Sequence, residues 1–353
     1  MHRALNRIAV AAGLVSLLSC SGSSRPQATA ETTASPPSGY FDNTGRDDVL
    51  SGGAKLIPIT TPKGTFHVWT KRVGNNPRIK VLLLHGGPGF THEYLESFDS
   101  HFPGAGFEYY YYDQLGSFFS DQPDEPSLWD LPRFVDEVEQ VRTALKLDRD
   151  SFYLYGHSWG GLLALEYALS HQDHLKGLIV SNMVSSIPRY NAYAEKVFKT
   201  TMDPAVLAEI RQFEATGTTD DPRYMGLLIP HHYEKHVIRM PYGSWPEPVQ
   251  RVFKHMNPKV YVPMQGPSEL GASGKLAHWD RSGDLGKITV PTLTIGAAHD
   301  TMDPEQMNWM SAQVKRGRFL YCPEGSHLAQ YDDPGHYFPG LIQFIRDVDA
   351  GTF

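Results

Sequence analysis

Residues 155–161 read YGHSWGG, and this stretch decides the fold of the chain. It follows the apolar segment SFYLYG and precedes LLALEYALSH, whose apolar residues recur at helical spacing. Gly156 and Gly160 therefore flank Ser158, in the pattern G-x-S-x-G, at a predicted corner between a buried strand and a helix. Small residues at these two positions allow a sharp turn that exposes the serine hydroxyl. Ser158 is a candidate nucleophile, although a serine at a helix start can also be a helix cap.

Strands and helices alternate on both sides of this corner. IKVLLLHGG and VPTLTIGAAHD suit strands buried on both faces, and LPRFVDEVEQVRTALKL has amphipathic helical spacing. Such alternation predicts an α/β fold, a mostly parallel sheet with helices on both faces. One long segment changes to helical stretches broken by proline and glycine, which indicates an inserted helical cap. The predicted boundaries are 46–184 and 287–353 for the α/β core and 185–286 for the cap.

Composition narrows the class of protein. The chain has 353 residues, of which 41% are hydrophobic and 20% charged, so it can bury a large core. Its net charge of −7 is spread without a long run of either sign, and no nucleic-acid partner is expected. The only cysteines are Cys20 and Cys322, so no disulfide framework is expected. Cys322 ends an apolar run and is interpreted as a small buried hydrophobic residue.

The first 20 residues have the layout of an export signal. Arg3 and Arg7 precede an apolar run that is too short to span a bilayer as a mature helix. The run ends in LLSC, which resembles the lipobox of bacterial lipoproteins, whose cysteine is acylated after cleavage. We therefore expect lipidation at Cys20, with an ordinary cleaved signal as the alternative. Residues 21–45 are rich in Ser, Thr and Pro and predict a flexible tether. The protein is therefore expected to be exported and to meet a membrane only through this lipid.

A serine hydroxyl needs a histidine base, and the histidine needs a carboxylate that orients it. In α/β-hydrolases the chain order is serine, acid, histidine. Asp300 follows the predicted strand VPTLTIGAAHD, at the end of a parallel strand where functional loops gather. His327 follows the last predicted strand, after a Gly-Ser turn. Ser158, Asp300 and His327 are therefore the predicted triad.

Other acids and histidines nearby have simpler interpretations. Asp303 precedes Pro304 and predicts a helix cap. His157 and His299, beside the nucleophile and the acid, are interpreted as structural. Three histidines in the predicted cap lack the acidic motif of a zinc site, so packing or pocket lining is expected and no metal is predicted: His231, His232 and His236.

The oxyanion hole should combine two backbone N–H groups. One belongs to the residue after the nucleophile, which is Trp159, and the other to the loop after the strand VLLLHGGPG. Glycines in this loop let the main chain approach a substrate. Gly87 is the predicted second donor.

Five motifs together resemble the proline iminopeptidase family of serine peptidases. They are HGGPG (85–89), YDQLGS (112–117), GHSWGG (156–161), GPSE (266–269) and GSH (325–327). The resemblance covers nearly everything from Lys55 onward. It implies an α/β-hydrolase domain with a helical cap, removal of N-terminal residues with proline often preferred, and no cofactor.

The resemblance also implies a substrate-binding acid. In that family a glutamate of the G-P-x-E stretch pairs with the free amine of the substrate, which corresponds to Glu269 here; an exposed loop carboxylate is the alternative. A second family acid often follows the catalytic aspartate, but this chain has Thr301 there. Small peptides and amino-acid amides are both expected substrates. An esterase or lactonase with the same triad, and a noncatalytic binding protein on the same scaffold, are the other hypotheses.

Overall fold

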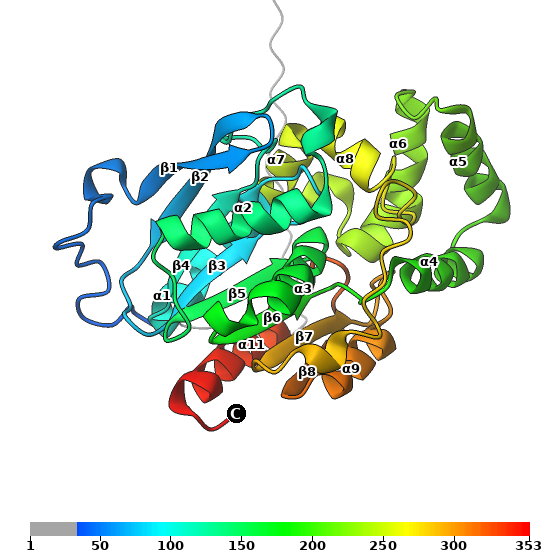
Figure 1. The fold of residues 1–353 in the computed structure, drawn as a ribbon. Helices are drawn as coiled ribbons and strands as arrows, with labels where there is room; N and C mark the ends of the chain where they lie inside the picture. Colours follow the sequence, from blue (N-terminus) through cyan, green and yellow to red (C-terminus); the bar gives the residue numbers. More distant parts are fainter. Residues whose placement is uncertain (1–33) are drawn as a thin grey trace, which may run out of the picture. The chain divides into compact units, whose positions relative to one another are not determined.

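The computed structural model describes residues 34–353, which form one compact unit (Figure 1). The predicted signal segment, Cys20 and residues 21–33 of the tether lie outside the described residues. Within the unit, eight strands form one sheet in the order β1-β2-β4-β3-β5-β6-β7-β8. Strand β2 runs antiparallel to β1 and β4, and every other neighbouring pair is parallel. This is the mostly parallel sheet that the alternating sequence predicts.

The central strands are apolar because both of their faces are covered. All residues of β4, β5, β6 and β7 are buried, whereas the edge strand β8 is partly exposed. The bounds of the strands are β1 Ala54–Thr61, β2 Gly64–Val73, β3 Lys80–Leu84, β4 Glu108–Asp113, β5 Phe152–His157, β6 Gly177–Ser181, β7 Thr292–Ala297 and β8 Gly317–Cys322.

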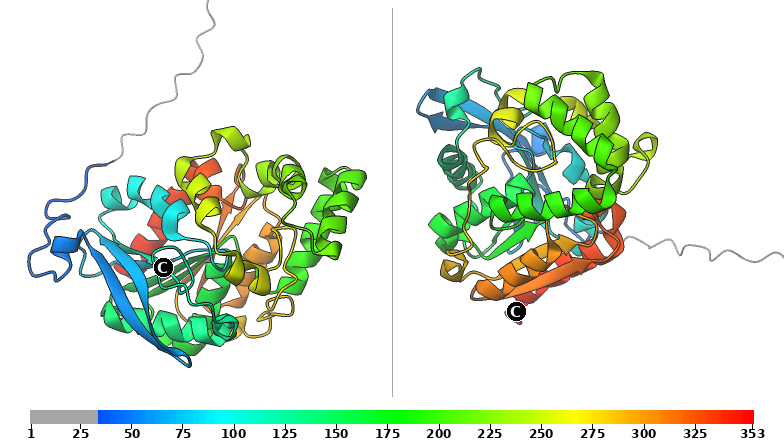
Figure 2. Two further views of the ribbon diagram at one scale, coloured as in Figure 1. Left: turned by 90° about the horizontal axis from the view of Figure 1, so that it is seen from above. Right: turned by 90° about the vertical axis from the view of Figure 1, so that its right-hand side faces the viewer.

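Helices cover both faces of the sheet. Figures 1 and 2 show α2 and α3 on one face and α11 on the other. Aromatic rings join α11 to the sheet: the hydroxyls of Tyr155 and Tyr337 lie 2.6 Å apart in the core. The core helices are α1 Phe102–Ala105, α2 Leu131–Ala144, α3 Trp159–His171, α9 Pro304–Gln313, α10 Ala329–Asp332 and α11 Pro334–Ala350, with the 3₁₀ helix η2 at His92–Ser100.

The chain between β6 and β7 is helical, as predicted for a cap. Prolines at the first helical turn and aspartate caps begin two of its helices: Asp203 accepts a hydrogen bond from the Ala205 N–H, and Asp221 from the Arg223 N–H. An antiparallel β-bridge between Ser186 and Asp280 joins the two ends of the insertion. These residues lie close to the predicted cap boundaries, 185 and 286, and the boundaries themselves stay a prediction. The helices are α4 Ile187–Thr201, α5 Pro204–Thr216, α6 Pro222–Leu228, the π-helix η5 Ile229–Val237, α7 Glu247–His255 and α8 Pro258–Met264.

The folded unit begins earlier than the predicted start at residue 46. Tyr40 is only 3% exposed, and its hydroxyl donates a hydrogen bond of 2.7 Å to the Phe107 carbonyl. A Cβ on Gly74 would lie only 2.4 Å from the Cζ atom of Tyr40, so the ring packs directly against this glycine. The flexible tether predicted for 21–45 therefore does not extend to Tyr40, because this aromatic side chain packs on the core. No helix among residues 34–353 is long and apolar enough to cross a membrane.

Candidate active site

Close packing of β3, β5 and α3 forms the turn that carries Ser158. A Cβ on Gly156 would lie 2.0 Å from the Gly160 carbonyl oxygen, and a Cβ on Gly160 would lie 2.2 Å from the Leu84 carbonyl oxygen. Both glycines of the motif are therefore required by space. Ser158 has φ 55° and ψ −127°, a strained backbone for a residue other than glycine. Its side chain makes no capping hydrogen bond to α3, so the helix-cap alternative is wrong.

Asp300 and His327 meet at the ends of neighbouring strands. Asp300 follows β7 and His327 follows β8, and both are buried. The Nδ1 atom of His327 lies 3.1 Å from each carboxylate oxygen of Asp300. His327 and Ser158 line the same pocket. The structure thus brings the three predicted residues together, with the Nε2 atom of His327 left to exchange a proton.

Asn182 holds the carboxylate of Asp300 by a further hydrogen bond. Its Nδ2 donates to Asp300 Oδ2 at 2.9 Å and to the Ser326 carbonyl at 3.1 Å, while the Met302 N–H donates to Asp300 Oδ1 at 3.0 Å. Asn182 has φ 50°, a conformation that asparagine tolerates better than most residues. Asn182 is not among the predicted site residues; the signal that could have marked it is a polar residue directly after the buried strand β6.

The environment of His327 makes it a stronger base than an isolated histidine. Burial lowers the pKa of His327, but the charge of Asp300 and its hydrogen bond, with the charge of Glu269, outweigh burial and raise the pKa above its ordinary value. A carboxylate that stabilises the imidazolium in this way is what the proton-transfer step requires.

Of the two predicted oxyanion donors, Gly87 lines this pocket, and Trp159 directly follows Ser158, which lines it too. The N–H of Trp159 is the first of α3 and has no acceptor within the helix, and the helix dipole adds partial positive charge there. Gly86 and Gly87 line the pocket. The Gly86 N–H already donates to the Tyr94 hydroxyl at 2.7 Å, which favours Gly87 as the second donor. Gly87 has φ 112°, a conformation that side chains rarely adopt. The role of Gly87 stays a prediction.

Glu269 is a buried carboxylate facing the same pocket. It is 8% exposed, and it lines the pocket with Ser158 and His327, so the exposed-loop alternative is wrong. The Tyr261 hydroxyl donates to Glu269 Oε1 at 2.5 Å. Burial raises the pKa of Glu269, against the lowering effects of a charged His327 and of the Tyr261 hydrogen bond. A positive group of a substrate would relieve this desolvation. Thr301, where the second family acid is expected, is buried.

Two cap histidines support the pocket rather than a metal. The Nε2 of His232 lies 3.1 Å from the Glu269 carbonyl, and the Nδ1 of His236 lies 2.8 Å from the His299 carbonyl. Burial lowers the pKa of both rings, so both are neutral donors. Asp303 caps α9 by accepting a hydrogen bond of 2.9 Å from the Glu305 N–H, as predicted. Cys322 is fully buried, also as predicted.

Among residues 34–353, one cluster has the residue types of a metal site: Glu139, His171 and His174. Arg142 already binds both carboxylate oxygens of Glu139, at 2.8 and 2.7 Å. Its guanidinium charge therefore occupies the position that a cation would need.

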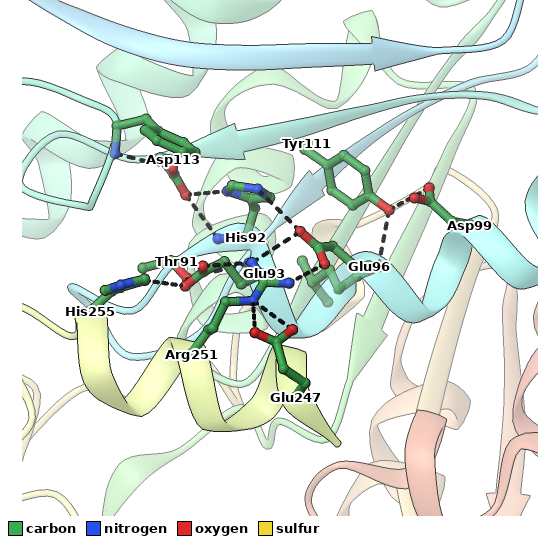
Figure 3. Close-up of polar contacts among 12 residues, drawn as sticks. Thr91, His92, Glu93, Glu96, Asp99, Tyr111, Asp113, Glu247, Arg251 and His255 are labelled. Atoms are coloured by element: carbon green, nitrogen blue, oxygen red, sulfur yellow. Dashed lines mark hydrogen bonds and ion pairs between the residues drawn. The ribbon is translucent and has the colours of Figure 1, made fainter. Parts of the chain in front are cut away.

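Cap helix α7 forms the apolar wall of the pocket and is fixed to the core by charge. It contributes Val252 and Phe253 to the lining. Figure 3 shows its attachment to η2: Arg251 lies 2.7 Å from one carboxylate oxygen of Glu93, and the Nδ1 of His255 lies 2.8 Å from the other. Glu93 is fully buried, and across the boundary between cap and core Arg251 neutralises its charge while His255 adds a hydrogen bond.

Comparisons with known proteins agree with this geometry. Residues 80–336 match the model of the alpha/beta hydrolase fold family. The chain is 56% identical over 294 residues to the proline iminopeptidase of Flavobacterium johnsoniae, covering 83% of this chain and 98% of that relative. It is 55% identical over 300 residues to the proline iminopeptidase of Elizabethkingia meningoseptica, covering 84% and 100%.

A solved structure agrees as well. The crystal structure of a proline iminopeptidase from Mycobacterium smegmatis matches with a TM-score of 0.74 at 26% identity, covering 85% of this chain and 100% of that one. The motif glycines are required by packing, Ser158 and His327 line one pocket, and Asp300 lies within hydrogen-bond distance of His327. With these features and with relatives that span nearly its whole folded length, this chain belongs to the proline iminopeptidase family of α/β-hydrolases.

Proposed function

We propose that this chain is a serine aminopeptidase that releases N-terminal residues, preferably proline, from small peptides. The observation that carries the proposal is the placement of a buried carboxylate, Glu269, and the nucleophile Ser158 at one pocket. A carboxylate at this place can pair with a free α-amino group next to the scissile carbonyl. The relatives with more than half of their residues identical are proline iminopeptidases, which supports proline as the preferred residue.

The reaction follows from the positions of the side chains. Ser158 Oγ attacks the carbonyl carbon of the N-terminal residue while Nε2 of His327 takes the hydroxyl proton, and Asp300 stabilises the resulting imidazolium. The Trp159 and Gly87 N–H groups hold the oxyanion of the tetrahedral intermediate. His327 then gives its proton to the leaving amine, so the scissile C–N bond breaks and an acyl-enzyme remains.

Hydrolysis of the acyl-enzyme repeats these steps with water as the nucleophile. His327 takes a proton from water, the hydroxide adds to the ester carbonyl, and Ser158 leaves with the proton returned by His327. The same site would hydrolyse amino-acid amides, because they share the free amine and the carbonyl carbon. An esterase for apolar acyl groups fits less well, since such a group would bury Glu269 without a charge partner.

A panel of aminoacyl naphthylamides, free and N-acetylated, tests the proposal on the purified mature chain. We expect free prolyl naphthylamide to have the highest kcat/KM and its N-acetyl form to be cleaved poorly. Ser158→Ala is the control for contaminating hydrolases. Equal cleavage of blocked and free substrates, or a preference for p-nitrophenyl esters over both, would instead indicate an esterase or an endo-acting peptidase.

We also propose that the enzyme is exported and held at a membrane by a lipid on Cys20, on the evidence of the LLSC sequence. Cys20→Ala is expected to abolish incorporation of radiolabelled palmitate in a bacterial host, while the folded unit keeps its activity. Cys322→Ala is the matched control and should still incorporate the label, because Cys322 is buried in the core. Equal labelling of wild type and Cys20→Ala would contradict the lipoprotein assignment.

A further inference from the structure

A line of hydrogen bonds crosses the floor of the pocket and joins two of its loops. The Gly86 N–H donates to the Tyr94 hydroxyl at 2.7 Å. That hydroxyl lies 2.9 Å from Nδ1 of His157, and Nε2 of His157 lies 2.7 Å from the carbonyl oxygen of His327. Tyr94 is 1% exposed and His157 is 2% exposed, so water does not compete for these bonds. All four residues line the pocket.

The chemistry of the partners fixes the direction of every bond. A carbonyl oxygen only accepts, so Nε2 of His157 carries the hydrogen that is donated to His327. Burial holds the pKa of His157 well below its ordinary value, so the ring is neutral and its Nδ1 is an acceptor. The Tyr94 hydroxyl therefore donates to Nδ1, and its oxygen accepts from Gly86. Tyr94 and His157 therefore each accept one hydrogen bond and donate the next one in the line.

The two ends of this line belong to different parts of the catalytic machinery. Gly86 precedes the predicted oxyanion donor Gly87 in the loop after β3, and His327 lies in the loop after β8. His157 ends β5, directly before Ser158, and β5 lies between these parts of the sheet. A histidine that merely filled the core would need a partner for each nitrogen, but these partners would not need to connect the loop after β3, through Tyr94 of η2, with the loop after β8.

We propose that Tyr94 and His157 are positioning residues, which together hold the oxyanion loop and the backbone of the catalytic base at a fixed separation around Ser158. The proposal rests on the serine-hydrolase function proposed above. The pair touches no reacting atom. Its contribution is to keep Gly87 and His327 in place as the tetrahedral intermediate forms, so its loss should lower kcat and leave the affinity of the ground state nearly unchanged.

Tyr94→Phe removes the shared hydroxyl and keeps the ring. We expect kcat for prolyl naphthylamide to fall by about ten- to hundredfold, less than the loss of an oxyanion donor itself, with KM changed by less than about threefold. The rate of labelling by a fluorophosphonate should fall in parallel. Tyr167→Phe is the matched control: it removes an equally buried hydroxyl that donates to Glu139 at 2.6 Å, away from the pocket, and should leave kcat unchanged.

Variants of His157 test the same line of hydrogen bonds at its second side chain. His157→Gln keeps an amide that can donate to the His327 carbonyl, whereas His157→Leu has no donor, so the glutamine variant should retain more of the wild-type kcat. If the two residues act as one unit, Tyr94→Phe combined with His157→Leu should lose no more activity than the worse single variant. If Tyr94→Phe does not fold, the comparison of Gln with Leu at His157 decides the matter alone.

The outcomes separate this proposal from the proposed function. A wild-type enzyme that is neither labelled by the fluorophosphonate nor active on prolyl substrates would overturn the function. An active wild type with a folded Tyr94→Phe variant of unchanged kcat would overturn the positioning role only. The positioning role would also be overturned by a change confined to KM or by equal activity of the Gln and Leu variants at position 157. It would likewise be overturned if the losses of activity in the two single variants multiply in the double variant.

Discussion

Replacement of Glu269 by glutamine separates recognition of the free amine from catalysis. The carboxylate is 8% exposed, and among residues 34–353 the Tyr261 hydroxyl is the one side chain that donates a hydrogen bond to it. The α-amino group of a substrate has a pKa of about 7.7–8.0, so much of it is cationic near neutral pH. Two unit charges about 4 Å apart interact by about 4 kcal/mol at an effective dielectric of about 20. Glutamine keeps the size of the side chain and removes this attraction.

The expected loss follows from that interaction. Truncation of one partner in a desolvated pair costs about 2–5 kcal/mol, and with the amide dipole retained we expect about 2–4 kcal/mol, which is about 30- to 900-fold in kcat/KM. Hydrolysis of a p-nitrophenyl ester without an amine should change by less than about threefold, because the triad and the oxyanion donors are intact. N-acetylation of the prolyl substrate should reproduce the loss with the wild-type enzyme.

The assay is steady-state kinetics with free prolyl naphthylamide, its N-acetyl form and the ester, on wild type and Glu269→Gln. Glu209→Gln is the matched control, because it removes the same charge from an exposed position of cap helix α5. If Glu269→Gln cleaves the free prolyl substrate within threefold of the wild type, or loses ester hydrolysis to the same extent, Glu269 does not bind the amine.

Three further predictions concern the catalytic residues. Ser158→Ala should stay folded, lose fluorophosphonate labelling and lower kcat by about a thousandfold or more; wild-type turnover would mean that another residue is the nucleophile. Asn182→Gly, which accepts φ 50° and removes the whole side chain with its amide, should lower kcat for the ester about tenfold with a folded circular dichroism spectrum; an unchanged kcat would show that Asp300 needs no such support. His327 must be neutral to act as a base, and the negative charge of Glu269 helps to raise the pKa of His327. The acid limb of the pH profile of kcat/KM for the ester should therefore move to lower pH in Glu269→Gln. No shift, or a shift to higher pH, would contradict the charge coupling between Glu269 and His327.

The sequence was most informative where chemistry and local geometry coincide. The glycines around Ser158 could be predicted because only residues without a side chain fit between β5, α3 and β3. Asp300 and His327 could be predicted because each lies in the loop that follows an apolar strand. The alternation of strands and helices likewise predicted the mostly parallel sheet, because strands buried on both faces are apolar throughout.

The supporting residues could not be predicted because their partners are distant in the chain. Asn182 meets Asp300 across 118 residues, and His157 meets the His327 carbonyl across 170. No local pattern marks a polar side chain whose hydrogen bond is closed only by the tertiary fold. The same reason explains the misplaced tether boundary: Tyr40 lies in a Ser- and Pro-rich segment, and its docking site is formed by Phe107 and Gly74, far along the chain.

The attachment of α7 to Glu93 has a consequence for the order of folding. Arg251 follows Glu93 by 158 residues and His255 follows it by 162, so both partners of a buried carboxylate in the first third of the chain are synthesised much later than the carboxylate itself. Contacts of such long range slow folding, and an unpaired charge at that place opposes early closure of the core. A chain that ends before residue 251 should therefore remain incompletely folded even though it contains six of the eight strands.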